Sequence, residues 1–410
     1  ALANGTPWAG QTFKSIVLVK DSTTNTISNL TIAHAADDTS NAGLFGEITS
    51  NGVVYDLKLS GGSVTARGGG RVGSIAGVNN GRIEAVSSSM TVNGNTAAGS
   101  TGGLAGINNG VILTSAYKGD VTGSMVGGLA GENTGYIQDS YTAGSVTGVS
   151  KVGGLVGYNH GNGDSTGVLR TVLSTATVTG ESKVGALVGN MDSGLLYQGR
   201  WSTTVSGDQA ATGAGDSEYT GDLVGYSTAD LQDQNKAGDV YAGFDLGNTW
   251  ALGSSAAASS DGQAHFAELY RADNILVVDA SRNGTYGDED FGDDYQLFGT
   301  VRDATVDVTV DSSAYGRDTH AGTHAGIRAH GVGSRRCVRT TPATSTAGNP
   351  AACRYPTGAG ARPAGTPASF GQQRGSGNRP AGRAGTRLGM RDDDGGVTGL
   401  LAIGDAAAGD

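Results

Sequence analysis

The feature that most constrains this chain is a short glycine–leucine motif that recurs through its first half. Gly-Leu-Ala-Gly106, Gly-Leu-Ala-Gly131 and Gly-Leu-Val-Gly157 head three similar units, each followed by an alternation of polar and apolar residues. Weaker copies close at Gly46, Gly77, Gly189 and Gly225, so the closing glycines lie 31, 29, 25, 26, 32 and 36 residues apart. Self-similarity at a period of about 20 to 50 residues indicates an array of stacked repeats.

Each unit is expected to form one turn of a β-solenoid (β-helix). In the unit 125–149, residues 126–131 predict a very short strand, 136–141 a second and 144–148 a third. Asn133-Thr134-Gly135 reads as a turn, because Asn and Gly tolerate positive φ at low cost. Helices are disfavoured, since each Gly costs about 1 kcal/mol relative to Ala in a helix. The side chains expected to stack inward are those of Leu129, Ile137 and Val146.

The predicted fold class is all-β, with four regions. Residues 1–41 form an N-terminal cap or first rung, with strands over 12–19 and 26–32. Residues 42–255 carry the short-strand, glycine-rich solenoid, and residues 256–312 a small β-module with strands over 274–279 and 303–310. Residues 313–410 are rich in Arg, Gly, Ala, Pro and Thr and lack periodicity, which predicts a disordered tail. Reading of a high-GC gene in the wrong frame would give the same composition.

The units resemble GLUG repeats, the Gly-Leu-x-Gly modules of large secreted bacterial surface proteins. Residues 27–32 followed by Ala42-Gly-Leu-Phe-Gly46 are similar to the usual lead-in, and residues 239–252, with Trp250, to the usual close. Thr285-Tyr286-Gly287-Asp288 resembles a signature of the β-modules that follow such arrays. The resemblance implies a filamentous-haemagglutinin-like exoprotein exported by two-partner secretion, with an outer-membrane secretion partner. It assigns no functional residues to the repeat.

Charge and composition narrow the function classes. Residues 1–316 hold 15 Lys and Arg against 32 Asp and Glu, a net charge of −17, which argues against a nucleic-acid partner. No stretch approaches the roughly 18 apolar residues of a membrane span. Cys337 and Cys353 are the two cysteines and have no metal-ligand spacing. The chain begins at Ala without a signal-like segment, so we interpret it as a mature chain or an internal fragment of a longer protein.

Candidate sites are few, and we predict no catalytic residues and no cofactor. A hydrolase or lyase needs paired carboxylates, but acids such as Glu132 and Asp139 fall at unrelated places in successive units and read as isolated surface charges. His160 reads as an exposed turn, and His34 and His265 have no evident partner. An acidic cluster has the oxygen ligands that Ca²⁺ prefers, although a solvated loop is the simpler interpretation; it comprises Asp288, Glu289, Asp290, Asp293 and Asp294.

Tyrosines recur near the predicted turn and second strand of the units. On a shared face they would form a stripe for stacking on sugars; the alternative is packing from rung to rung. The stripe residues are Tyr117, Tyr136, Tyr141 and Tyr158, with Tyr197 further along. A flat threonine face for a crystalline surface is a weaker idea, because one threonine recurs per unit, at Thr91, Thr122, Thr147 and Thr179.

The sequence therefore predicts a non-enzymatic, secreted or surface-displayed structural repeat protein of a Gram-negative bacterium. It would adhere to extracellular or cell-surface glycans or proteins through many weak contacts along a rod. The alternative is a carbohydrate-active β-helix enzyme, a polysaccharide lyase or hydrolase, or its non-catalytic part. Asp and Glu residues from neighbouring rungs that converged in one groove would favour that alternative.

Overall fold

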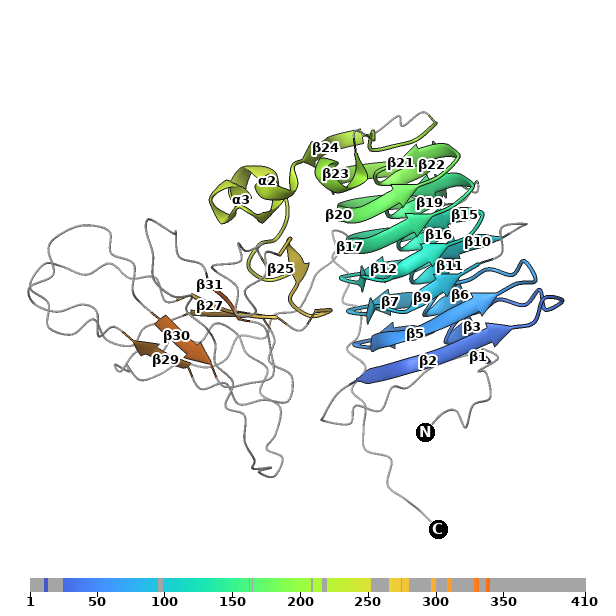
Figure 1. Cartoon of the computed structure of the whole chain (residues 1–410), viewed down its shortest axis with the longest axis horizontal. Helices are drawn as coiled ribbons and strands as arrows, with labels where there is room; N and C mark the ends of the chain where they lie inside the picture. Colours follow the sequence, from blue (N-terminus) through green and yellow to red (C-terminus); the bar gives the residue numbers. More distant parts are fainter. Residues whose placement is uncertain are drawn as a thin grey trace, which may run out of the picture. The chain divides into compact units, whose positions relative to one another are not determined.

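A computed structural model describes thirteen separate parts of the chain. These are residues 11–13, 25–94, 99–161, 163, 165–207, 209–215, 220–251, 265–273, 275–279, 296–299, 308–311, 328–331 and 337–339. They all belong to the compact unit formed by residues 1–375. Residues 26–226 wind into a parallel β-solenoid of about six turns, drawn from blue to green in Figure 1. The solenoid prediction is confirmed.

Three sheets, which we name A, B and C, run along the solenoid, and their strand pairings are all parallel. Sheet A follows the order β1 (Gln11–Phe13), β3 (Phe45–Ile48), β6 (Ala76–Asn79), β11 (Ala105–Asn108), β16 (Ala130–Asn133), β19 (Val156–His160) and β22 (Val188–Asp192). Sheet C contains β10 (Ser100–Gly102), β15 (Met125–Gly127), β18 (Ser150–Gly153) and β21 (Ser182–Gly185). The remaining strands of the turns belong to sheet B.

Sheet B has 13 strands and two kinds of segment. A short segment begins each pass through the sheet: β4 (Val53–Tyr55), β7 (Arg82–Glu84), β12 (Val111–Leu113) and the start of β17 (Tyr136–Thr147), β20 (Val168–Thr179) and β23 (Leu195–Ser202). The second part of each pass is longer, and in some turns it is divided into two short strands. Its strands are β2 (Thr26–His34), β5 (Lys58–Ala66), β8 (Ser87–Ser88) with β9 (Thr91–Asn93), β13 (Ala116–Tyr117) with β14 (Asp120–Thr122), and β24 (Thr220–Tyr226).

The strand boundaries within one turn differ from the prediction. Residues 126–131 are divided between β15 and β16, because the chain bends between Gly127 and Ala130. The predicted second and third strands merge into β17. Gly144, the first residue of the predicted third strand, lies inside β17, adopts φ +97° and pairs with Ala176 of β20. A glycine can therefore adopt positive φ inside a strand without interrupting its pairing with the next turn.

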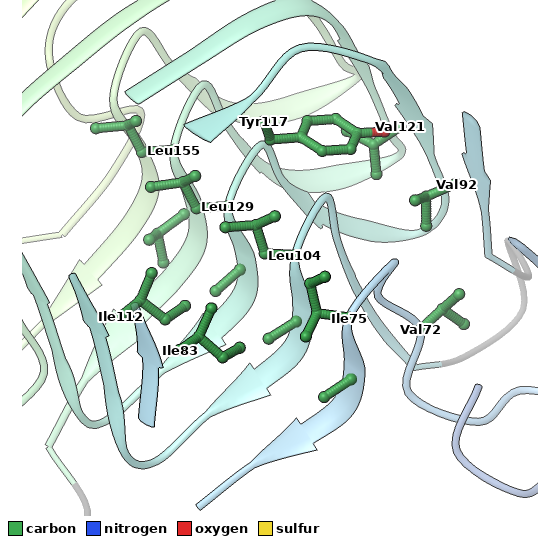
Figure 2. Close-up of a cluster of buried hydrophobic side chains, with 14 of the residues drawn as sticks. Val72, Ile75, Ile83, Val92, Leu104, Ile112, Tyr117, Val121, Leu129 and Leu155 are labelled. Carbon is green, nitrogen blue, oxygen red and sulfur yellow. The ribbon is translucent and has the colours of Figure 1, made fainter. Parts of the chain in front are cut away.

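The motif leucines form the core of the solenoid. Ile75, Leu104, Leu129 and Leu155 lie one above another, and Figure 2 shows them as a column facing Ile83 and Ile112. Leu129, like Ile137, is fully buried, as predicted, and burial of each such side chain contributes about 1.5–3 kcal/mol.

The motif glycines permit close contacts between neighbouring stretches of backbone. A Cβ on Gly131 would lie 2.5 Å from the backbone nitrogen of Thr101, and one on Gly128 would lie 2.1 Å from the carbonyl oxygen of Gly154. Both distances are far inside van der Waals contact, so no larger residue fits at these two positions without backbone movement. The recurrence of Gly-Leu-x-Gly thus has a steric cause.

The last copy of the motif does not head a turn of sheet A. Gly225 lies in β24, which pairs with β23 of sheet B in the register Trp201–Gly225. The position after β22 along sheet A is taken instead by Thr212, which bridges Val188. The spacing of 36 residues before Gly225, the longest in the series, accompanies this change of place.

A buried ladder of asparagine side chains follows the turn predicted at Asn133. The Nδ2 of Asn79, Asn108 and Asn133 each donates to the Oδ1 of the next asparagine, at 2.7 Å in each case, and the series ends at Asn159. Asn133 is not among the residues with positive φ. The prediction of a bend is right, but its reason is different: the amides satisfy one another inside the stack.

Residues 228–251 and 265–275, which we call the outer segment, lie against the outside of sheet B. They contain α2 (Thr228–Gln232), a 3₁₀ helix (Gln234–Lys236), α3 (Ala237–Val240), β25 (Trp250–Ala251) and β26 (Glu268–Leu269); α1 (Thr203–Ser206) precedes them. Trp250, Phe244 and Leu269 form a second buried cluster with Ala116, Tyr141 and Leu173, which share one outward register column of sheet B. Residues 239–251, from the stretch 239–252 that was expected to close the array, thus pack across earlier turns.

The remaining strands lie further along the chain. β27 (Leu276–Asp279) and β29 (Val308–Asp311) fall in the two strands predicted for the β-module; β28 (Gln296–Gly299) pairs with β27. β30 (Arg328–Gly331) and β31 (Cys337–Arg339) lie in the region 313–410. The rest of that region, residues 14–19 of the strand expected over 12–19, and residues 285–288 lie outside the described residues, so the expectations about them stay predictions.

Candidate functional site

The short segments of sheet B present two columns of outward side chains in register across six turns. The first column is Val53, Arg82, Val111, Tyr136, Val168 and Leu195, and the second is Tyr55, Glu84, Leu113, Gln138, Arg170 and Tyr197. All twelve are exposed or partly exposed. Neighbouring strands of a sheet are about 4.8 Å apart, so the columns repeat at that interval along the solenoid. We call Tyr136, Gln138, Arg170 and Tyr197 the tyrosine patch.

A chain of hydrogen bonds orders one side of the tyrosine patch. The hydroxyl of Tyr136 donates to Oε1 of Gln138 at 2.6 Å, and Nε2 of Gln138 donates to Oδ2 of Asp139 at 2.8 Å. The indole N–H of Trp250 donates to Oδ1 of the same carboxylate at 3.2 Å. The buried tryptophan of the outer segment thereby fixes the carboxylate that positions Gln138 and Tyr136.

Asp139 occupies a strained corner that every turn shares. Its φ is +47°, and the equivalent residues of other turns, among them Thr114 and Gln198, also have positive φ without being glycine. Burial raises the pKa of Asp139, although hydrogen bonds from Trp250 and Gln138 oppose this effect. The sequence indicated an isolated surface charge, but Asp139 is a partly buried carboxyl group that accepts hydrogen bonds from Gln138 and Trp250.

The pKa of Asp139 predicts a specific dependence of stability on pH. Since its pKa is higher in the folded than in the unfolded chain, its stabilising contribution is present at low pH and is lost as pH rises through the raised pKa. We therefore expect Asp139→Asn to gain stability relative to the wild type between pH 4 and pH 7, measured by urea unfolding. The control is Asp120→Asn, which removes the exposed carboxylate at the first residue of β14. An equal pH response in both variants would contradict the assignment.

Arg170 is the exposed cation of the tyrosine patch. Its strand neighbours in the second column are Gln138 on one side and Tyr197 on the other. Arg82, the other arginine of the two columns, pairs with Glu84 at 2.7 Å, whereas Arg170 makes no ion pair with any residue that the structure describes. The patch thus combines two tyrosines, an amide and a guanidinium that makes no direct ion pair with a described residue but is attracted to the carboxylate of Asp139.

Two tyrosines of the predicted sugar-stacking stripe are buried. Tyr117 points into the solenoid, with its hydroxyl 2.8 Å from the carbonyl oxygens of Met90 and Asp120. Tyr141 points outward, but the outer segment covers it, and its hydroxyl donates to Asp273. Neither ring face is open to a ligand, so the stripe does not form as predicted.

Tyr158 belongs to a different cluster, on sheet A. His160 stacks on its ring at a centroid distance of 4.2 Å, and Nζ of Lys151 lies 3.5 Å from the ring centroid. Two groups this close occupy opposite faces, so both faces of Tyr158 are covered. Its hydroxyl donates to Asp192 at 3.0 Å, and burial, followed by Asp192, raises its pKa. Of the four predicted residues, Tyr136 alone remains in the exposed columns.

Two acidic residues of sheet A, Glu132 and Asp192, lie two turns apart in one cluster with Tyr158 and His160. Nε2 of His160 lies 2.8 Å from Oε1 of Glu132, and Ser100 donates to the other oxygen of Glu132 at 3.2 Å. His160 is therefore an ion-pair partner in β19 and not a simple exposed turn residue. Asp192, two turns from Glu132, completes the cluster through Tyr158.

The other two histidines named in the sequence have partners. His34 is buried, with Nδ1 3.2 Å from both the hydroxyl of Ser40 and Oδ2 of Asp38. Nδ1 of His265 lies 3.9 Å from Oε2 of Glu268.

An ionic cluster joins the outer segment to the solenoid. Nζ of Lys118 lies 2.8 Å from both Oε1 of Glu268 and Oδ1 of Asp273. Burial lowers the pKa of Lys118, but the two carboxylates outweigh burial and raise it above its usual range. The single cation thus bridges two carboxylates and attaches the outer segment to the solenoid.

Threonines on the longer segments of sheet B align more fully than the sequence indicated. Thr122, Thr147 and Thr179 share one register column with Asn93, and Thr91 lies in the neighbouring column with Ser145 and Thr177. Asp120 interrupts that neighbouring column. The face is polar and regular but is not a continuous threonine array.

The described residues contain no group of three or more His, Cys, Asp or Glu side chains arranged to hold a metal ion. The acidic cluster Asp288, Glu289, Asp290, Asp293 and Asp294 lies outside the described residues. Within the part of the chain that the structure covers, no helix has the length and apolar character needed to cross a membrane.

The fold defines the chain as a β-solenoid repeat protein. No family model matches the sequence. A stretch of 75 residues is 44% identical to Halomucin of Haloquadratum walsbyi (strain DSM 16790 / HBSQ001); it covers 18% of this chain and 1% of Halomucin. No solved structure matches the chain.

Proposed function

We propose that this chain is part of a secreted or surface-displayed adhesive repeat protein that contacts glycans through the tyrosine patch. The observation that carries the proposal is the register of the outward columns, which places Tyr136, Gln138, Arg170 and Tyr197 on three consecutive turns of one rigid face. Tyrosine combines a large apolar ring with a polar tip, which suits the two-sided chemistry of a sugar. Repetition along a rod adds avidity to individually weak contacts.

The sequence supports the proposed context. The glycine–leucine motifs and the solenoid agree with GLUG-type arrays of haemagglutinin-like exoproteins, and the match to part of Halomucin agrees with a segment of a longer repeat protein. In that context an outer-membrane secretion partner would export the chain, and extracellular or cell-surface glycans or proteins would be its targets.

Affinity electrophoresis through gels that contain defined polysaccharides tests the adhesive function. We expect Tyr136→Ala combined with Tyr197→Ala to weaken binding by about 5-fold to 150-fold, since each aromatic contact contributes about 0.5–1.5 kcal/mol and 1.4 kcal/mol is a factor of ten. Tyr158→Ala is the matched control, because both faces of that ring are already covered. A wild-type protein retarded by no polysaccharide, or an equal effect of the control, would refute the proposal.

The cluster of Glu132, Tyr158, His160 and Asp192 favours a second candidate, a carbohydrate-active enzyme. Both carboxylates are engaged in hydrogen bonds, and the pKa of Tyr158 is raised, which opposes its use as a base near neutral pH. Release of reducing ends or unsaturated sugars by the wild type, lost in Glu132→Gln, would support this candidate.

A further inference from the structure

We propose that the tyrosine patch selects acidic glycans, and specifically sugars that carry a carboxylate, through Arg170. The inference rests on the proposed glycan-binding function and names its ligand class. Arg170 is exposed and lies in register between Gln138 and Tyr197, in the second outward column. A guanidinium presents a planar fork of N–H donors that pairs with both oxygens of a carboxylate.

The neighbouring side chains set the direction of the ligand. Gln138 and Tyr197 lie on the strands on either side of Arg170, each about 4.8 Å away along the solenoid axis. Tyr136 lies beside Gln138 in the first column and is hydrogen-bonded to it. A polysaccharide that runs along the axis would place one carboxylate on Arg170 and its flanking sugars on the two tyrosines.

The charges on this face leave Arg170 as the selecting group. Arg82 is compensated by Glu84, and the nine side chains of the two columns other than Arg82, Glu84 and Arg170 carry no charge. Arg271 of the outer segment lies over the ring of Tyr55, four turns away from Arg170 in the second column. A neutral glycan would engage the tyrosines but bring no charged partner to the guanidinium. An acidic glycan gains the charged pair in addition, so the patch distinguishes the two by that contact.

The acidic body of the protein constrains how the selection works. Residues 1–316 carry a net charge of −17, which repels a polyanion at long range. Recognition must then come from short-range contact at Arg170. Added salt screens the long-range repulsion as well as the local pair, so we expect a much flatter salt dependence than basic polyanion-binding proteins show.

The network behind the patch makes it a preorganised site. Asp139 holds Gln138 in place and is itself held by the indole of Trp250. Side chains that are ordered before binding lose less conformational entropy when the ligand arrives. The outer segment, which packs on the outside of sheet B, therefore supports the site through the hydrogen bond from Trp250 to Asp139.

Isothermal titration of the full chain with oligogalacturonate and with the same oligomer methyl-esterified at its carboxyl groups tests the inference. We expect the acid form to bind at least tenfold more tightly than the ester. Arg170→Gln should reduce the acid form to the affinity of the ester and leave the ester unchanged. Arg82→Gln, at a cation already paired, should alter neither affinity. Tyr197→Ala should weaken both forms together.

The outcomes separate this inference from the proposed function. Equal binding of acid and ester by the wild type would overturn the selection of carboxylates and leave glycan binding intact. Tighter binding of dextran sulfate than of oligogalacturonate, also dependent on Arg170, would overturn the choice of carboxylate over sulfate. Failure to bind any of the three, together with no retardation by other polysaccharides, would overturn the proposed function itself. Unchanged melting of Arg170→Gln confirms that its effect is on binding.

Discussion

Replacement of Arg200 by leucine is expected to destabilise the protein by about 3–5 kcal/mol, the usual cost of removing one partner from a buried charged network. Arg200 is 1% exposed, and its guanidinium donates to the carbonyl oxygens of Val240 at 2.6 Å and Asp222 at 2.6 Å. It also donates to the Asp222 carboxylate at 2.7 Å and to the carbonyl oxygen of Ala242 at 3.3 Å. Leucine fills similar space but leaves these acceptors without donors.

The loss should fall on the attachment of the outer segment. Arg200 belongs to β23, whereas Val240 and Ala242 belong to the end of α3 and the turn after it. We expect a lower urea midpoint and a red shift of the fluorescence of Trp250, which is fully buried. Arg170→Leu, the same change at an exposed arginine, should stay within about 0.5 kcal/mol of the wild type. A cost below that of the control would show that water replaces the guanidinium.

Replacement of Asn133 by alanine is expected to cost about 2–4 kcal/mol, because it interrupts the buried amide ladder and leaves two polar neighbours unsatisfied. Asn133 accepts from Asn108 and donates to Asn159, each at 2.7 Å, and it also donates to the carbonyl oxygen of Gly135 at 3.2 Å. The neighbours have no water to turn to, since both are fully buried.

An exposed amide ladder beside the buried one provides the control. Asn109 donates to Asn80 at 2.8 Å at the surface, where water replaces a lost partner. Asn109→Ala should therefore cost less than about 1 kcal/mol in the same urea titration. Equal costs at Asn133 and Asn109 would show that the buried ladder is rehydrated in the variant.

The sequence predicted the solenoid because its cause is local and repeated. Leu129 recurs at a fixed place in each unit, and its neighbour Gly131 permits the backbone approach that closes each turn. The first and last residues of each strand were harder to predict from the sequence. The merging of two predicted strands into β17 depends on pairing with β20, which no single unit contains.

The tyrosine stripe failed because the prediction treated similar places in successive units as equivalent. In the structure Ala116 pairs with Tyr141, so Tyr117 lies one residue further along its turn than Tyr141 does. A shift of one residue moves a side chain to the other face of a strand, and Tyr117 therefore points inward while Tyr141 points outward. Tyr158 lies on sheet A, on a different side of the turn.

The packing of the outer segment on sheet B could not be predicted from the sequence, because its contacts join residues far apart in the chain. Lys118 meets Glu268 across 150 residues, and Tyr141 meets Asp273 across 132. No periodicity connects such positions. The sequence shows that Tyr197 belongs to the repeating tyrosines. Its place beside Arg170 follows only from the register between β20 and β23.

The asparagine ladder has a mechanical consequence. Its hydrogen bonds, like those of the parallel sheets, run along the solenoid axis and join one turn to the next, at intervals of 29, 25 and 26 residues. Tension between the ends of the stack loads these junctions one after another. Each turn that detaches releases roughly 25 residues, or about 80–90 Å of extended chain. We expect force spectroscopy to show a sawtooth of such steps, so the rod would lengthen under load while its remaining turns keep their binding faces.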